Sequence, residues 1–219
     1  MQIFLDTANL EEINHAAKLG VLRGVTTNPS LAAKEGVVDL ANYRDIVREI
    51  AEVVDGPISA EVLSTNANDM VREGLEIARW APNVVVKIPS SLDGLEAISK
   101  LAKDGIKINQ TLCFSVNQAI LGAAAGSNFV SPFVGRLDDE GHNGMALVAD
   151  IVSVFRQYDI DCKVMAASIR HPLHCIEAAK AGAHIATVPY KVLAQMMDHS
   201  LTDVGIERFS RDWNKAETV

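Results

Sequence analysis

The sequence predicts an α/β fold, a single (β/α)8 barrel (TIM barrel) followed by an extra C-terminal helix. Short apolar runs alternate with longer segments in which apolar residues recur at intervals of three and four, as strands and helices do around a mostly parallel sheet. Eight such runs occur in 219 residues, about 27 residues per unit, which suits a compact barrel. Polar residues close many of these runs, at the end where barrel proteins carry their functional groups.

The predicted strands are short and rich in Val, Ile and other apolar residues. They cover residues 3–5, 24–27, 58–63, 84–88, 106–112, 129–134, 163–167 and 185–188. Amphipathic helices are predicted between them, among others at residues 10–19, 43–54, 70–80 and 95–103. Near the C-terminal end, Ile206, Phe209 and Trp213 form an apolar stripe at helical spacing, which we expect to pack on the barrel or on another subunit.

A doubly wound open sheet is the alternative architecture. It is the weaker one because the Gly-x-Gly-x-x-Gly signature of that fold does not follow the first strand, where residues 5–9 read LDTAN instead. No Pro-, Gly- or Ser-rich linker and no low-complexity segment interrupts the repeated pattern. We therefore expect one domain over residues 1–219.

The charge balance argues against a nucleic-acid-binding protein. Lys and Arg number 20 and Asp and Glu number 28, which gives a net charge of −8. With an isoelectric point near 5.2, such a surface repels phosphate backbones. Anionic small molecules remain possible ligands, because a local cluster of arginines can override the overall field inside a cleft.

The three cysteines, Cys113, Cys162 and Cys175, lie far apart in apolar surroundings. Their odd number and wide spacing favour neither a disulfide framework nor a zinc site, so we interpret them as buried thiols in a reducing compartment. The N-terminal residues MQIFLD contain no basic leader, and no apolar run approaches the ~20 residues that a membrane span needs. These features predict a cytoplasmic protein that does not contact membranes.

Polar residues close the predicted strands at the edge where barrel enzymes place their chemistry. The set comprises Asp6, Asn28, Glu61, Lys87, Thr111, Arg136, Ser168 and Arg170. Alternation along the strand at 58–63 places Ser59, Glu61 and Leu63 on one face, which we expect to be the barrel interior.

Lys87 is the most informative single residue. It stands in the apolar run VVVKIP at residues 84–89, whereas lysine is among the residues least often buried. Burial disfavours the ammonium form, and a neutral amine can attack a ketone to form a Schiff base. The structural alternatives are an ion pair with Asp6 or Glu61, or a side chain that extends outward between helices.

Asp6 and Glu61 could both reach Lys87, one as a base and the other as a proton donor through water. Asp6 could equally be the N-cap of the helix that begins near Leu10. Asn28 precedes a proline, and Asn-Pro commonly begins a turn, so a turn-forming role is open for it.

Arg136 and Arg170 suggest a phosphate clamp beside Ser168 and the helix that starts near His171. Solvated surface arginines are the structural alternative. The loop at residues 135–142 lacks P-loop spacing and is acidic, which argues against an ATP site. His171 and His174 have no third metal ligand at suitable spacing, and Ser168 lacks the Gly-x-Ser-x-Gly elbow of a hydrolase nucleophile.

Four motifs resemble the transaldolases, in particular the short-chain subfamily that also contains fructose-6-phosphate aldolase. They are FLDTAN at residues 4–9, GVTTNPS at 24–30, VKIP at 86–89 and SPFVGR at 131–136. The resemblance extends to the terminal region around Asp212 and Trp213. It implies a (β/α)8 barrel that forms a Schiff base without a metal or other cofactor, acts on sugar phosphates and assembles into a homo-oligomer, a pentamer or a decamer.

The resemblance also assigns roles residue by residue. It implies that Lys87 is the Schiff-base lysine and Asp6 the general acid and base. It further implies that Glu61 and Thr111 hold the catalytic water and that Asn28 and Asn109 bind substrate hydroxyls. Arg136, Ser168 and Arg170 match the residues that bind phosphate. Ser131 and Phe133 lie in the same substrate-binding motif as Arg136.

Two positions bear on the choice within the subfamily. The aldolase branch carries Gln where Glu61 stands and Tyr where Phe133 stands. A tyrosine hydroxyl near the Schiff base could deliver water or protons that release free dihydroxyacetone, whereas Phe133 offers no proton. The resemblance therefore implies a transaldolase that transfers a dihydroxyacetone unit between sugar phosphates; an aldolase and a sugar-phosphate-binding barrel without turnover are the alternatives.

Overall fold

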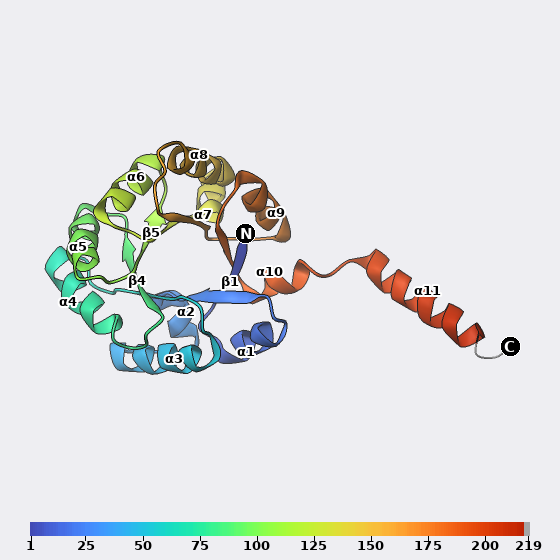
Figure 1. The fold of residues 1–219 in the computed structure, drawn as a ribbon. Helices are drawn as coiled ribbons and strands as arrows, with labels where there is room; N and C mark the ends of the chain where they lie inside the picture. The colour runs from blue at the N-terminus through green and yellow to red at the C-terminus, as the bar shows by residue number, and fades with distance from the viewer. Residues whose placement is uncertain (217–219) are drawn as a thin grey trace.

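The chain forms a closed barrel of eight parallel strands surrounded by helices (Figure 1). A computed structural model of the protein describes residues 1–216. The strands are β1 (Gln2–Asp6), β2 (Leu22–Thr26), β3 (Ile58–Glu61), β4 (Val84–Pro89), β5 (Ile108–Cys113), β6 (Phe129–Pro132), β7 (Lys163–Ala166) and β8 (Ile185–Val188). Each strand pairs with the next and β8 pairs with β1, so the predicted (β/α)8 barrel is confirmed and the open sheet is wrong.

The helices fall into three groups. The outer ring consists of α1 (Leu10–Lys18), α3 (Leu40–Val53), α4 (Ala67–Ile77), α5 (Leu92–Lys103), α6 (Val116–Ala125), α8 (Gly144–Gln157) and α9 (Pro172–Ala181). Three short helices begin directly after strands β2, β6 and β8, namely α2 (Pro29–Lys34), α7 (Val134–Asp139) and α10 (Tyr190–Gln195). They stand at the carboxyl end of the barrel, where they shape its mouth. The last helix is α11 (Ser200–Ala216).

Short polar side chains fix where most helices begin. Seven N-cap residues accept a hydrogen bond from a backbone N–H of the first turn: Asn9, Asn28, Asp39, Asn66, Ser91, Ser115 and Asn143. Each cap satisfies a donor that has no partner within the helix. At the other ends of α6 and α9, Gly126 and Gly182 adopt the left-handed conformation that stops a helix at little steric cost.

All eight predicted strands are present, and the boundaries differ by a few residues. One difference changes a residue's predicted place: β3 ends at Glu61, so Leu63 is exposed and its predicted place in the barrel interior is wrong. The cause is Glu73 on α4, whose buried carboxylate accepts hydrogen bonds from the backbone N–H groups of Leu63 and Ser64. These bonds hold residues 63 and 64 in an irregular segment, where the periodic pattern alone predicts a longer strand.

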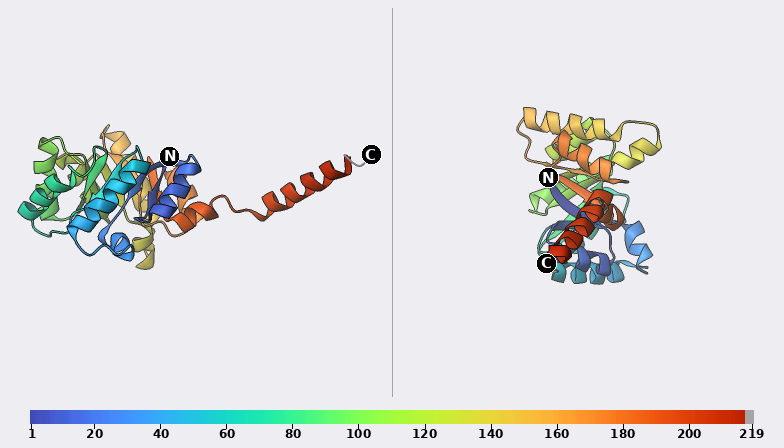
Figure 2. Two further views of the ribbon diagram at one scale, coloured as in Figure 1. Left: turned by 90° about the horizontal axis from the view of Figure 1, so that it is seen from below. Right: turned by 90° about the vertical axis from the view of Figure 1, so that its right-hand side faces the viewer.

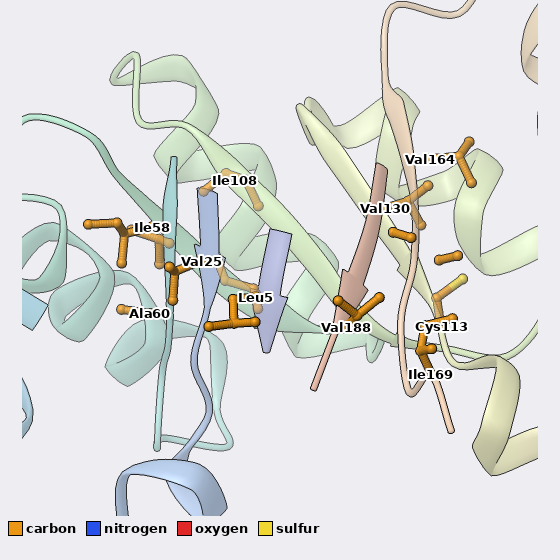
Figure 3. Close-up of a cluster of buried hydrophobic side chains, with 14 of the residues drawn as sticks. Leu5, Val25, Ile58, Ala60, Ile108, Cys113, Val130, Val164, Ile169 and Val188 are labelled. Atoms are coloured by element: carbon orange, nitrogen blue, oxygen red, sulfur yellow. The ribbon is translucent and has the colours of Figure 1, made fainter. Parts of the chain in front are cut away.

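The strands have two different faces. Outward-facing side chains pack beneath the helices and form the main apolar core, including Leu5, Val25, Ile58, Val130 and Val188 (Figure 3). At the amino ends of the strands, a separate apolar cluster consists of Phe4, Val85, Phe129, Met165 and Ile185. Gly24 is required beside this layer because a Cβ there would lie 2.5 Å from the ring of Phe4. A solid floor therefore lies beneath the polar residues of the mouth.

The helix α11 stands apart from the barrel. After α10 the chain runs outward, and α11 projects from the side of the barrel as an isolated rod (Figures 1 and 2). None of its side chains from Ser200 to Lys215 is buried, and Phe209 and Trp213 are 73% and 68% exposed. The helix itself was predicted correctly, but packing on the barrel is wrong because the connecting segment leads away from it. Packing on another subunit stays a prediction.

The three cysteines lie inside the protein. Cys113, Cys162 and Cys175 are buried, as predicted, and burial raises the pKa of their thiols to about 11, about 12 and about 11. Cys113 packs in the core between the barrel and the helices (Figure 3). Among the helices in the described part of the chain, none is long and apolar enough to cross a membrane.

Candidate active site at the barrel mouth

A cavity of about 310 Å³ opens at the carboxyl ends of the strands. Its volume is that of a small-molecule site. Eight of the eleven predicted site residues line it: Asp6, Asn28, Lys87, Ser131, Phe133, Arg136, Ser168 and Arg170. These residues come from strands β1, β4 and β6 and from the segments after β2, β6 and β7. The barrel thus brings together side chains that lie far apart in the sequence.

Lys87 projects from β4 toward this cavity and is only 4% exposed. Its Nζ lies 3.0 Å from a carboxylate oxygen of Glu61 and donates a hydrogen bond to the backbone carbonyl of Thr27 at 3.2 Å. The outward-extending alternative is therefore wrong, and the ion pair with Glu61 is present. A buried amine beside a carboxylate that can take its proton is a suitable nucleophile for a carbonyl group.

Three predicted residues, Glu61, Thr111 and Asn109, belong to the inner wall and do not line the cavity. Asn109 is fully buried; its amide donates to Ser59 Oγ at 3.0 Å and its carbonyl accepts from Ser131 Oγ at 2.7 Å. The hydroxyl of Thr111 is buried and makes no hydrogen bond to any residue that the structure describes. Asn109 thus holds Ser131 in place, and Thr111 retains a free donor and acceptor inside the wall.

Asp6 closes β1 at the cavity. Burial raises the pKa of this carboxyl group above its usual range, although the nearby Lys87 ammonium and a hydrogen bond from Thr26 act in the opposite direction. The Thr26 hydroxyl donates to Asp6 at 2.7 Å and lies 2.6 Å from the Thr187 hydroxyl. A carboxyl group with a raised pKa beside a buried lysine suits a role in proton transfer.

The two capping alternatives have different outcomes. The N-cap of α1 is Asn9, whose side chain accepts from Glu12 N, so the interpretation of Asp6 as this cap is wrong. Asn28 caps α2 by accepting from Leu31 N at 2.9 Å and also lines the cavity. Its Oδ1 serves the helix, which leaves its amide N–H groups for a ligand.

Arg136 follows β6, and Ser168 and Arg170 follow β7; all three line the cavity, and β6 and β7 are neighbouring strands. Arg170 is paired with Asp139 at 2.7 Å, and its side chain lies against Gly135, where a Cβ would come within 2.7 Å of it. Ser168 has a left-handed backbone with φ 57°, an uncommon conformation for serine. Such strain clusters at functional sites, and two guanidinium groups at one mouth can bind a phosphate.

Ser131 and Phe133 complete this side of the wall. Ser131 is buried and donates to Asn109, and Phe133 packs edge-on against Phe114 with ring centroids 5.7 Å apart. The ring of Phe133 presents an apolar surface to the cavity at the position where a tyrosine would present a hydroxyl.

The sequence reasoning missed four residues that shape the site. Lys34 at the end of α2 lines the cavity, as do Thr26 and Thr187. Tyr43 on α3 hydrogen-bonds from behind the wall to Thr27 and to the backbone of Glu61. The signals were weak: the threonines sit inside apolar strands, and Lys34 and Tyr43 belong to helices whose approach to the mouth depends on tertiary packing.

The histidine pair has a structural explanation. The rings of His171 and His174 lie 3.8 Å apart, His174 Nδ1 accepts from Arg170 N, and His174 Nε2 lies 3.1 Å from Asp138. Burial, together with the His171 charge, lowers the pKa of His174. Within residues 1–216 no group of His, Cys, Asp and Glu side chains could hold a metal ion.

Comparison with known proteins places this barrel in a family. The sequence model of the transaldolase/fructose-6-phosphate aldolase family matches residues 3–219. The chain belongs to this family. The family resemblance of the four motifs is thereby confirmed over nearly the whole length.

Relatives of this transaldolase-family chain are similar along their full length. It is 60% identical over 218 residues to a "Probable transaldolase" of Dehalococcoides mccartyi, covering 99% of this chain and 100% of that protein. It is 58% identical to one of Moorella thermoacetica and 56% identical to one of a Thermoanaerobacter species, and each match covers 98–99% of both chains. These similarities support an enzyme of the aldolase and transaldolase type.

Proposed function

We propose that the protein is a transaldolase that forms a Schiff base through Lys87. It would move a dihydroxyacetone unit from a ketose phosphate, such as fructose 6-phosphate or sedoheptulose 7-phosphate, to an aldose phosphate, such as erythrose 4-phosphate or glyceraldehyde 3-phosphate. The observation that carries this proposal is a lysine, 4% exposed, at the cavity, 3.0 Å from Glu61 and close to the carboxyl group of Asp6. This reaction belongs to the non-oxidative pentose phosphate pathway.

The first step is formation of the imine. Nζ of Lys87 passes a proton to Glu61 and attacks the C2 ketone, and the carbinolamine then loses its hydroxyl as water. Glu61 returns the proton to that leaving hydroxyl, and the Thr111 hydroxyl, which has no protein partner among the described residues, can hold the water. The product is a protonated imine that withdraws electrons from C3.

The second step breaks the carbon chain. Asp6 removes the proton of the C4 hydroxyl, the C3–C4 bond breaks, and its electron pair passes into the imine to give an enamine on Lys87. The aldehyde product leaves. The acceptor aldehyde then takes its place, the enamine carbon attacks its carbonyl carbon, and Asp6 returns the proton to the new hydroxyl. Water then adds to the protonated imine at C2 and the C–N bond breaks, which releases the new ketose phosphate and the free amine of Lys87.

The substrate's phosphate would lie against Arg136, Arg170 and Ser168. Donor and acceptor each carry a terminal phosphate, so a single clamp at one side of the cavity can position both in turn. Asn28 and Ser131 are the candidate partners of the sugar hydroxyl groups, and Asn109 would act by holding Ser131 in place. Arg170 must share its guanidinium with Asp139 or exchange that partner for the phosphate.

Two residues favour transfer over release. Phe133 offers no hydroxyl to protonate the enamine, and Glu61 replaces the Gln of the aldolase branch. An enamine that is not protonated stays on Lys87 until an aldehyde arrives. The relatives described above are named "Probable transaldolase", which supports transfer over release.

The proposal extends to assembly and compartment. The isolated α11 exposes Leu201, Val204, Phe209 and other apolar groups, and a neighbouring copy of the chain is the partner that a ring-shaped pentamer or decamer would supply. Three buried thiols fit a reducing cytoplasm. We expect no nucleic-acid or membrane partner.

The test is a product analysis by mass spectrometry. The protein is incubated with fructose 6-phosphate, with and without erythrose 4-phosphate. Sedoheptulose 7-phosphate formed only with the acceptor supports the transaldolase. Free dihydroxyacetone that accumulates without acceptor would indicate an aldolase, and no conversion in either sample would indicate a barrel that binds without turnover.

A further inference from the structure

Tyr43 is a residue of the outer helix α3 whose hydroxyl reaches the barrel wall. Its side chain is buried, with its ring packed edge-on against Trp80 at 5.4 Å between centroids. It does not line the cavity. Its Oη lies 2.6 Å from Thr27 Oγ1 and 3.1 Å from the backbone nitrogen of Glu61. The hydroxyl therefore bridges the ends of β2 and β3.

The hydrogen atoms in this bridge can be placed in only one way. The N–H of Glu61 donates to Tyr43, which therefore accepts there. The Thr27 hydroxyl uses its one hydrogen on the backbone carbonyl of Ser59, at 2.9 Å. Tyr43 must then donate to Thr27. Burial raises the pKa of Tyr43 to about 12, so the phenol stays protonated and continues to donate its hydrogen to Thr27.

The bridge stands where the sheet no longer holds the two strands together. The paired residues of β2 and β3 end with Thr26 and Ser59, and one more backbone hydrogen bond joins Thr27 N to Ser59 O. Beyond that point, the N–H of Glu61 is satisfied by Tyr43 instead of by β2. The hydroxyl of Tyr43 thus takes the place of the next backbone hydrogen bond between β2 and β3.

Both anchored residues contact the same atom. Nζ of Lys87 donates to the carbonyl of Thr27 at 3.2 Å and lies 3.0 Å from the carboxylate of Glu61. These are the partners that the structure gives to the lysine's charged end. One phenol therefore fixes the two backbone segments that hold Nζ.

We propose that Tyr43 is a positioning residue for the reactive amine, acting through Thr27 and Glu61 and never touching the substrate. This inference rests on the proposed function of Lys87. Small displacements of a nucleophile cost large factors in rate, so loss of the bridge slows imine formation more than it weakens substrate binding.

The first variant is Tyr43→Phe, which keeps the ring and removes the bridge. Imine formation is followed by rapid mixing with fructose 6-phosphate, borohydride quenching and intact-mass measurement. We expect the rate to fall by about 10- to 100-fold, with KM for both substrates within about twofold. The matched control is Tyr158→Phe, which alters an exposed tyrosine and leaves the rate unchanged.

The second set of variants tests the route. Thr27→Val removes the hydroxyl that accepts the hydrogen bond from Tyr43 and so breaks the same series of hydrogen bonds. It therefore slows imine formation to a similar extent. The double variant is no slower than either single one, because both changes break one unit. Thr27→Ser keeps the hydroxyl and restores the rate. If Tyr43→Phe does not fold, the Thr27 variants decide alone.

The possible outcomes separate the two proposals. Loss of thermal stability in Tyr43→Phe with an unchanged rate of imine formation would overturn the positioning role and leave the proposed function intact. Additive losses in the double variant would also overturn it. No trapped adduct in the unaltered protein would overturn the proposed function, and the role of Tyr43 with it.

Discussion

The two layers of the barrel interior are built on the same strands and differ in what they do. On β1 and β4, Phe4 and Val85 belong to the closed apolar layer, whereas Asp6 and Lys87, two residues further along, face the cavity. The lower layer gains stability by burying carbon. The upper layer buries charge, which costs stability and is retained only where partners or chemistry require it.

One strand can serve both purposes because every second side chain of a strand points to the same face. A shift of one residue would exchange the interior for the helix-facing side. Parallel pairing fixes the register, with Glu61 opposite Lys87 and Lys87 opposite Asn109. Stability and reactivity are therefore separable along one strand. Substitutions in the apolar layer lower thermal stability and spare turnover, whereas substitutions in the polar layer lower turnover.

Lys87→Met and Val85→Ala separate the two layers most strongly. Lys87→Met removes the nucleophile, and turnover falls by about 10⁴-fold or more, as it does when a covalent nucleophile is deleted. Val85→Ala leaves a small cavity in the floor and costs about 2 kcal/mol of unfolding free energy, which lowers Tm by several degrees. Steady-state rates and thermal melts check both.

A large loss of turnover in folded Val85→Ala would contradict the separation of layers, as would wild-type turnover in Lys87→Met. Because Val85→Ala keeps all the polar residues, its kcat per folded molecule should stay within about twofold of the unaltered protein.

Asp6→Asn gives the next largest effect. Turnover falls by about 10²- to 10⁴-fold through loss of the general acid and base. Burial raises the pKa of Asp6 in the folded state, so its ionised form disfavours folding, and stability from this group is lost as pH rises through that raised pKa. The variant is therefore more stable than the unaltered protein at pH 7.

Thermal melts at several pH values check the sign. The advantage of Asp6→Asn shrinks as pH falls and disappears below about 3.8, the ordinary pKa of the group, where the carboxyl is protonated in both states. An advantage that grew toward acid would show that the Lys87 ion pair, and not desolvation, dominates at Asp6.

Arg170→Gln has a smaller and selective effect. Loss of a charge-assisted hydrogen bond to phosphate lowers kcat/KM for fructose 6-phosphate by about 10- to 100-fold, because such bonds contribute about 1.5–3 kcal/mol. Trapping of unphosphorylated dihydroxyacetone stays unchanged. Arg72→Gln, on the surface of α4, is the control. Equal losses for both substrates would refute the phosphate clamp.

Asp139→Asn has the smallest effect. Asp139 and Arg170 are about half exposed, so their ion pair contributes at most about 1 kcal/mol. Releasing Arg170 lowers KM for phosphorylated substrates by about two- to fivefold, and added salt reduces the difference. A raised KM would mean that Asp139 orients Arg170 instead of competing for it.

Much of the fold could be predicted from the sequence because strand burial leaves a local signature. The apolar run around Lys87 indicates a strand and a functional lysine at once, since each neighbour predicts burial. The end of β3 could not be predicted, because Glu73 acts on it from the next helix. Likewise, the apolar stripe of α11 predicts a helix but not its direction away from the barrel.

The site was predictable where a residue closes a strand and hidden where it acts from elsewhere. Tyr43 has the pattern of a core aromatic on an amphipathic helix, and only its hydroxyl partners show otherwise. Lys34 has the pattern of a surface lysine, and only the position of α2 brings it to the cavity. Tertiary contacts of this kind leave no periodic signal in the sequence.

The residue that borohydride reduction modifies in the presence of fructose 6-phosphate shows directly whether Lys87 is the nucleophile. Protease digestion and mass spectrometry locate the adduct. We expect a reduced three-carbon adduct on the peptide that contains Lys87, and none in Lys87→Met. An adduct on Lys34 or another lysine, or its persistence in Lys87→Met, would show that Lys87 is not the nucleophile.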